Sequence, residues 1–216
     1  MTASRLSIYN DALTVSGERT LSTLSDNVET RYLLDQVWNS NGVRKCLELG
    51  QWHFAMRGVQ VDYDTSITPD FGYARAFTKP SDWVLTSALC SDEFFRVPVT
   101  RYTDEAGNWY SDLDTIYVRY VSDDSNYGGN YANWPESFEE LVALYFASKI
   151  ILKISNDDKR TQLLLGLYQK QLKVAKNRAA MAMPTSFPAT GGWVRARARG
   201  GNNSRDGGGT GGNLIG

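Results

Sequence analysis

The segment from residue 135 to residue 154 is apolar on almost every face of the helix that its spacing predicts. Beyond the glutamates at its start, only a narrow stripe through Glu139, Lys149 and Lys153 interrupts the apolar surface. Pro135 suits the first turn of a helix, and the glutamates that follow it complement the positive helix end. A helix that is apolar nearly all round has to be buried, so other elements must pack around it. The sequence therefore predicts a central buried helix.

Two helices are expected before this segment. The first covers residues 6–14 and is closed by Gly17, because glycine readily adopts the left-handed conformation that ends helices. Ser25 and Asp26 offer side-chain oxygens that could cap the second helix. Its apolar residues continue in pairs at helical spacing past Gly42, where we expect a bend.

One amphipathic helix is expected after the central one. Its apolar face is formed by Leu164, Tyr168, Leu172, Ala175 and Ala179. Its other faces carry Lys159, Lys170, Lys173, Lys176 and Arg178. Such a helix usually packs its apolar side and leaves its bases in water.

The middle of the chain has the pattern of short antiparallel strands. Turn signals at 68–70, 79–82 and 105–108 separate runs rich in valine, threonine and aromatic residues. Alternation over residues 116–121 has the period of a strand, and Gly107 is expected to close a hairpin. The predicted class is α+β, mainly an α-helical bundle with an inserted antiparallel β-region. The expected parts are the N-terminal helices of the bundle (1–58), the β-rich insertion (59–125), the C-terminal helices of the bundle (126–183) and an extended tail (184–216).

The tail is rich in glycine and arginine, and residues 191–216 hold 10 of the 19 glycines. Ordering each residue costs about 1–2 kcal/mol of backbone entropy. Burial of a large apolar side chain returns only about 2–3 kcal/mol. We therefore expect this segment to order only against a partner, either another protein or a neighbouring copy. The residues expected to bind there are Trp193, Arg195, Arg197, Arg199, Arg205, Leu214 and Ile215.

The net charge of −1 hides an asymmetry between two parts of the chain. Residues 1–148 hold 11 basic and 21 acidic side chains, a balance of −10. Residues 149–216 hold 12 basic and 3 acidic side chains, a balance of +9. The C-terminal part therefore suits an acidic partner, which leaves nucleic acid, an acidic protein and the acidic face of a neighbouring copy as alternatives.

No catalytic, cofactor or metal motif is apparent. His53 is the only histidine and lies between two aromatic residues, and the two cysteines, Cys46 and Cys90, have no metal-ligand spacing. The acidic run from Asp62 lacks the glycine and the final glutamate of a calcium loop. Asp123 and its neighbour are typical of a solvated turn. We therefore expect a protein that is not an enzyme.

The chain has no apolar leader of signal-peptide type, and its most apolar stretch is interrupted by lysines and is shorter than the roughly 20 residues of a membrane span. We expect neither secretion nor membrane insertion.

Over residues 6–180 the order and spacing of several short motifs resemble the head-to-tail adaptors of tailed bacteriophages, of the tail tubular protein A or gatekeeper type. These motifs are Tyr9–Leu13, Ser16–Glu18, Leu24–Asp26, Arg44, Leu47, Trp52–Ala55, Tyr73–Phe77, Pro80–Trp83, Tyr120, Asp123, Trp134–Phe138 and Ala143–Ile154.

The resemblance implies a structural virion protein, made in the host cytoplasm, that forms a ring of about twelve copies at the head-tail junction. The ring would bind the portal protein on one side and the tail nozzle on the other. DNA would be retained by it and would leave through it without sequence-specific binding. The resemblance implies no cofactor. The bundle core implied is Tyr9, Leu13, Trp52, Phe54, Trp134, Phe138 and Leu141.

Two other functions stay open at this point. The chain could be a different neck or head-completion (stopper) protein of the virion. It could also be a small nucleic-acid-binding protein, because Trp193 and the arginines after it resemble a basic arm with an aromatic anchor.

Overall fold

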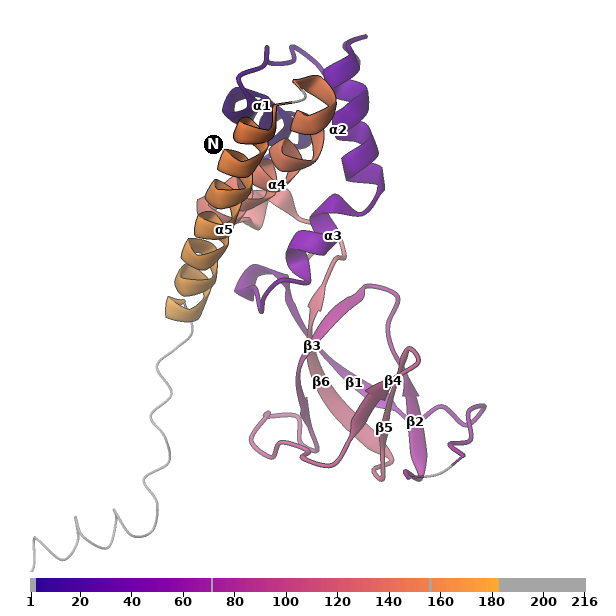
Figure 1. Cartoon of the computed structure of the whole chain (residues 1–216). Helices are drawn as coiled ribbons and strands as arrows, with labels where there is room; N and C mark the ends of the chain where they lie inside the picture. The colour runs from indigo at the N-terminus through magenta and orange to yellow at the C-terminus, as the bar shows by residue number, and fades with distance from the viewer. Residues whose placement is uncertain (1–2, 71, 156, 183–216) are drawn as a thin grey trace, which may run out of the picture. The chain divides into compact units, whose positions relative to one another are not determined.

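The computed structural model describes residues 3–70, 72–155 and 157–182 (Figure 1). The predicted α+β class is confirmed. In chain order the elements are α1 (Arg5–Ser16), α2 (Glu29–Asn39), α3 (Gly42–Leu47), η1 (His53–Ala55), β1 (Met56–Asp62), β2 (Arg75–Thr78), β3 (Trp83–Cys90), β4 (Thr103–Glu105), β5 (Asn108–Ser111), β6 (Thr115–Ser122), η2 (Tyr131–Asn133), α4 (Glu136–Ile154) and α5 (Asp158–Met181). In these ranges no helix is both long and apolar enough to span a bilayer.

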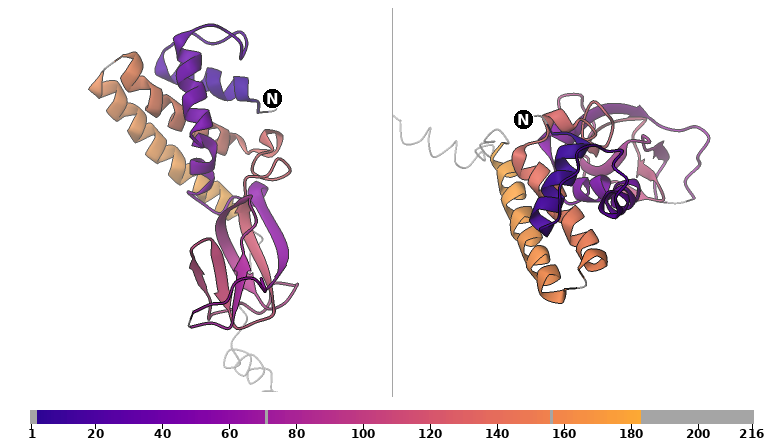
Figure 2. Two further views of the ribbon diagram at one scale, coloured as in Figure 1. Left: turned by 90° about the vertical axis from the view of Figure 1, so that its right-hand side faces the viewer. Right: turned by 90° about the horizontal axis from the view of Figure 1, so that it is seen from above.

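Helix α4 is the element around which the other helices pack. It contacts α1, α2, α3 and α5, and 11 of its 19 residues are buried (Figures 1 and 2). Buried side chains from all five helices form one cluster, which we call the helical core. The central buried helix expected from the apolar pattern is therefore present.

The helix ends follow the sequence signals in part. Ser4 caps α1 and exchanges side-chain hydrogen bonds with Ser7 in a capping box. Gly17 closes the same helix with φ of 75°, as predicted. The predicted cap of the second helix is wrong, because α2 begins at Glu29 after Val28, which makes no side-chain cap. Asp26 instead accepts hydrogen bonds from the backbone of the preceding turn.

The bend expected at Gly42 is a complete break between α2 and α3. Asn41 has a left-handed φ of 61° and starts the new helix. A Cβ atom at Gly42 would lie 2.7 Å from the carbonyl oxygen of Val37 and 3.1 Å from the ring of Phe146. The glycine therefore lets this corner of the chain lie directly against α4.

The strands form two antiparallel sheets, in the orders β1-β6-β3 and β2-β5-β4. The predicted hairpin is confirmed, since β4 and β5 are joined by Ala106 and Gly107, which both have positive φ. The side chains that the two sheets bury form a second cluster, the strand core, made of Phe77, Leu89, Trp109, Ile116, Val118 and Tyr120.

The two cores meet along β3 and β6. Three residues of β6 belong to the strand core, whereas Val121 at its end is fully buried in the helical core. Val84 at the start of β3 is also part of the helical core. The strands are thus joined to the helices by shared packing as well as by the chain.

Candidate functional site

The residues predicted to bind partners through the tail lie outside the described residues. They are Trp193, Arg195, Arg197, Arg199, Arg205, Leu214 and Ile215. The candidate surfaces that follow all belong to residues 3–182.

The residues assigned to the bundle core lie in or against the helical core. Six of them are buried, namely Tyr9, Leu13, Trp52, Trp134, Phe138 and Leu141. Phe54 is half-buried and packs against the same cluster.

Four of these residues build an aromatic cluster where η1 meets the start of α4. Phe138 lies at its centre, with ring centroids 4.8 Å from Trp52, 4.8 Å from Phe54 and 4.9 Å from Trp134. The Trp134 indole N–H donates to the carbonyl of Gly128 at 2.8 Å, and the Trp52 indole donates to the carbonyl of Leu47 at 3.1 Å. The two tryptophans thus fill the core and also anchor the loop at Gly128 and the end of α3.

A polar cluster around Asp82 lies beside the aromatic one. Its carboxylate accepts hydrogen bonds from Arg57 at 2.8 Å, from the Tyr120 hydroxyl at 3.1 Å and from Ser122. Burial alone would raise the pKa of Asp82, but the bonds from Ser122 and Arg57 outweigh it and hold the pKa below its usual value. Asp82 therefore ties β1 and β6 to the turn before β3.

Arg44 makes a second polar link between the helices and the strands. Its guanidinium, carried by α3, donates both to the Asp123 carboxylate and to the backbone carbonyl of Trp83. We call the aromatic cluster, the Asp82 cluster and this Arg44 link together the junction. Its residues come from α3, η1, β1, β3, β6 and α4 and from the loops beside them.

The residues considered for chemistry are held in structural contacts. The His53 ring N–H donates to the carbonyl of Ala179 at 2.6 Å. Burial raises the pKa of the Cys46 thiol to about 12 and also raises that of Cys90. Asp123 pairs with Arg44. Over residues 3–182, apart from 71 and 156, no group of three or more His, Cys, Asp or Glu side chains is placed to hold a metal ion.

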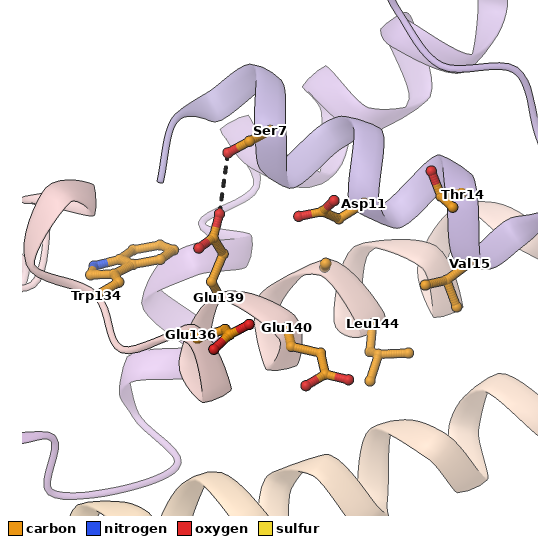
Figure 3. A pocket seen from close by; sticks show the side chains of 10 residues that line it. Ser7, Asp11, Thr14, Val15, Trp134, Glu136, Glu139, Glu140 and Leu144 are labelled. Atoms are coloured by element: carbon orange, nitrogen blue, oxygen red, sulfur yellow. Dashed lines mark hydrogen bonds between the residues drawn. The ribbon is translucent and has the colours of Figure 1, made fainter. Parts of the chain in front are cut away.

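An open groove of about 700 Å³ runs between α1 and α4 (Figure 3). Its walls carry the carboxylates of Asp11, Glu136, Glu139 and Glu140 beside the apolar side chains of Val15, Ala143, Leu144 and Trp134. None of these four carboxylates forms an ion pair within the described part of the chain. Partial burial raises the pKa of Asp11. We call this feature the acidic groove.

An exposed side of α5 carries a second surface feature. Seven exposed residues, three basic and four apolar, repeat there at intervals of three or four, and we call them the outer face of α5: Lys159, Leu163, Leu167, Lys170, Val174, Arg178 and Met181. Leu163 is 63% exposed and Met181 is 83% exposed. Among the described residues, none of the basic side chains of α5 forms an ion pair.

The bases of α5 were expected to be solvated, and neither surface was expected to bind a partner. The glutamates of the groove had been assigned only to the positive end of α4, and nothing local indicates that α1 would lie beside them. The outer face of α5 did leave a signal, because Leu163, Leu167 and Val174 form a second apolar stripe next to the one that is buried.

No family model matches the chain, and no curated protein matches it either.

Proposed function

We propose that this protein is a head-to-tail adaptor of a tailed bacteriophage, a structural subunit without enzymatic activity. Copies of it form a ring beneath the portal, and the ring contributes to retaining DNA and to its exit channel. The helices act as the bundle of such an adaptor, the strands as its inserted β-region, and residues 184–216 as an extended glycine-rich tail.

The convergence of the motif residues at the junction carries this proposal. Arg44 and Asp123 are 79 positions apart in the chain but form an ion pair. The motif around Pro80 supplies Asp82, which binds Tyr120 of another motif. The motifs at residues 52–55 and 134–138 supply the whole aromatic cluster. This convergence supports the proposal, because the motifs form one connected set of contacts.

The proposal assigns a partner to each part of the molecule. The helices and residues 184–216 bind the portal, and the sheets face the tail nozzle. During exit the channel does not bind DNA tightly, because each phosphate neutralised by the channel would add affinity and slow its passage. The arginines beyond residue 193 accordingly bind protein rather than DNA.

Electron microscopy of the full chain, alone and mixed with its cognate portal protein, tests the proposal. We expect closed rings stacked on the portal, of about twelve copies as the resemblance implies. A variant lacking residues 193–216 should lose portal binding and leave any DNA binding unchanged.

Two other outcomes would point to different functions. Rings that bind a completed adaptor but not the portal itself would indicate a stopper protein. Monomers that ignore the portal and bind duplex DNA, with an affinity that falls steeply as salt rises, would indicate a nucleic-acid-binding protein. The basic outer face of α5 is the described feature that would favour this second alternative.

A further inference from the structure

We infer that the outer face of α5 in one copy of this protein docks into the acidic groove between α1 and α4 of the next copy. This inference rests on the proposed ring and names the surfaces that close it.

The charges on the two surfaces are complementary and unused. The groove presents four carboxylates and the outer face of α5 presents three basic side chains, and none of them is paired within the described part of one copy. Partial burial already disfavours the charged form of Asp11 in the free groove, as its raised pKa shows. A cation delivered by a neighbour would relieve that cost. Electrostatic matching of this kind steers association and sets its register.

The apolar side chains on the two surfaces match as well. Leu163, Leu167 and Val174 recur along the outer face at the spacing by which a helix anchors itself in a groove. Val15 and Leu144 line the same groove, at the end beyond Asp11 and Glu140 (Figure 3). No residue of α5 lines the groove in the same copy. A row of exposed leucines promotes aggregation of a monomer, whereas in an assembly the same row forms an interface.

The arrangement also suits a closed ring. The groove and the outer face are different surfaces of one chain, so their contact is head-to-tail rather than self-complementary. Each copy offers one of each, which allows every copy to contact two neighbours. A two-fold dimer would instead pair a surface with itself.

Paired charge reversals in the full chain test this contact. One variant reverses the groove with Glu136→Lys and Glu140→Lys, and the other reverses α5 with Lys159→Glu and Lys170→Glu. All four positions are exposed, so both variants should fold. Each alone should give at least about tenfold less portal-bound ring than the wild type. An equimolar mixture should recover the rings, because in an alternating ring each reversed groove meets a reversed α5 and each unreversed groove meets an unreversed α5.

The matched control is Lys149→Glu with Lys176→Glu, which makes the same charge change at one exposed position of α4 and one of α5, neither of them on the outer face. It should assemble like the wild type. Circular dichroism and urea midpoints establish that every variant is folded. The inference is overturned if the folded α5 variant assembles normally, or if the mixture stays unassembled. If the wild type itself forms no ring on the portal, the proposed function fails instead.

Disulfide trapping gives an independent test. The variant with Glu140→Cys and Lys170→Cys should give a ladder of covalent oligomers on mild oxidation with the portal present. The native thiols Cys46 and Cys90 are buried and should contribute little to it. The matched control, Glu140→Cys with Lys176→Cys, should give no ladder. An equal ladder in both variants would contradict the proposed geometry.

Discussion

Helices α4 and α5 are neighbours in the chain and pack along each other, yet their side chains are used in opposite ways. Of the 19 residues in α4, 11 are buried, whereas only Leu164 and Ala175 are buried in the 24 residues of α5. Both helices are rich in leucine. The difference is that α4 is covered on nearly every side, while α5 is covered on one. We conclude that α4 holds the fold together and that α5 presents a surface.

A matched pair of leucine substitutions should show the largest difference. Leu141→Ala removes a fully buried side chain of α4 and should lower the free energy of unfolding by about 2–5 kcal/mol, because it leaves a cavity. Leu163→Ala makes the same chemical change on α5, where the side chain is 63% exposed. It should change the free energy of unfolding by less than about 0.5 kcal/mol. Urea unfolding of both variants measures this. Similar losses at the two sites would show that α5 is covered as well.

The junction tests whether stability depends on contacts beyond α4. Asp82→Ala leaves Arg57, Tyr120 and Ser122 without their shared acceptor and should cost about 2–3 kcal/mol. The control is Asp114→Ala, which removes only an exposed pair with Arg75 and should cost less than about 1 kcal/mol. Thermal unfolding compares the two. A negligible effect of Asp82→Ala would mean that the two cores are joined by packing alone.

Two glycines give effects of opposite sign. A methyl group at Gly42 would collide with the Val37 carbonyl and the Phe146 ring, so Gly42→Ala should cost about 1–3 kcal/mol. Gly166 lies inside α5 with nothing within 4 Å of an added Cβ, so Gly166→Ala should stabilise the protein by about 0.5–1 kcal/mol. The unfolding midpoints of the two variants should shift in opposite directions. A lower midpoint in Gly166→Ala would mean that an added methyl group at this position meets other atoms.

The elements of this fold were predictable where a local pattern sets them. The apolar run of α4, the inward face of α5, the left-handed Gly17 and the hairpin turn at Gly107 all follow from spacing and glycine chemistry. The N-cap of α2 was not predictable, because Asp26 bonds to the turn before it rather than to the helix after it. Both choices are available to a short acidic side chain, and only the path of the chain decides between them.

The candidate surfaces were less predictable than the elements that carry them. Asp11 and Glu140 belong to helices far apart in the sequence, and their meeting in one groove depends on how α1 packs on α4. The junction is similar, because no local signal joins Arg44 to Asp123. Such contacts are set by tertiary packing, which a periodic pattern in the sequence does not specify.

The smallest effect concerns the covered side of α5. Burial raises the pKa of the Tyr168 hydroxyl to about 12, above its value in the unfolded chain. An acid whose pKa is raised by folding binds its proton more tightly in the folded state. Its contribution to stability is therefore complete below about pH 10 and is lost as the pH rises toward about 12.

Since Tyr168 is only partly buried, solvent screening keeps this contribution small. The free energy of unfolding should fall less between about pH 9 and about pH 12 in Tyr168→Phe than in the wild type, because only the wild type has this raised pKa. The substitution removes only this hydroxyl, so the difference between the two profiles is due to its loss. Identical alkaline profiles would show that water reaches the inward face of α5 as freely as the outer face, and the contrast with α4 would then extend to both sides of the helix.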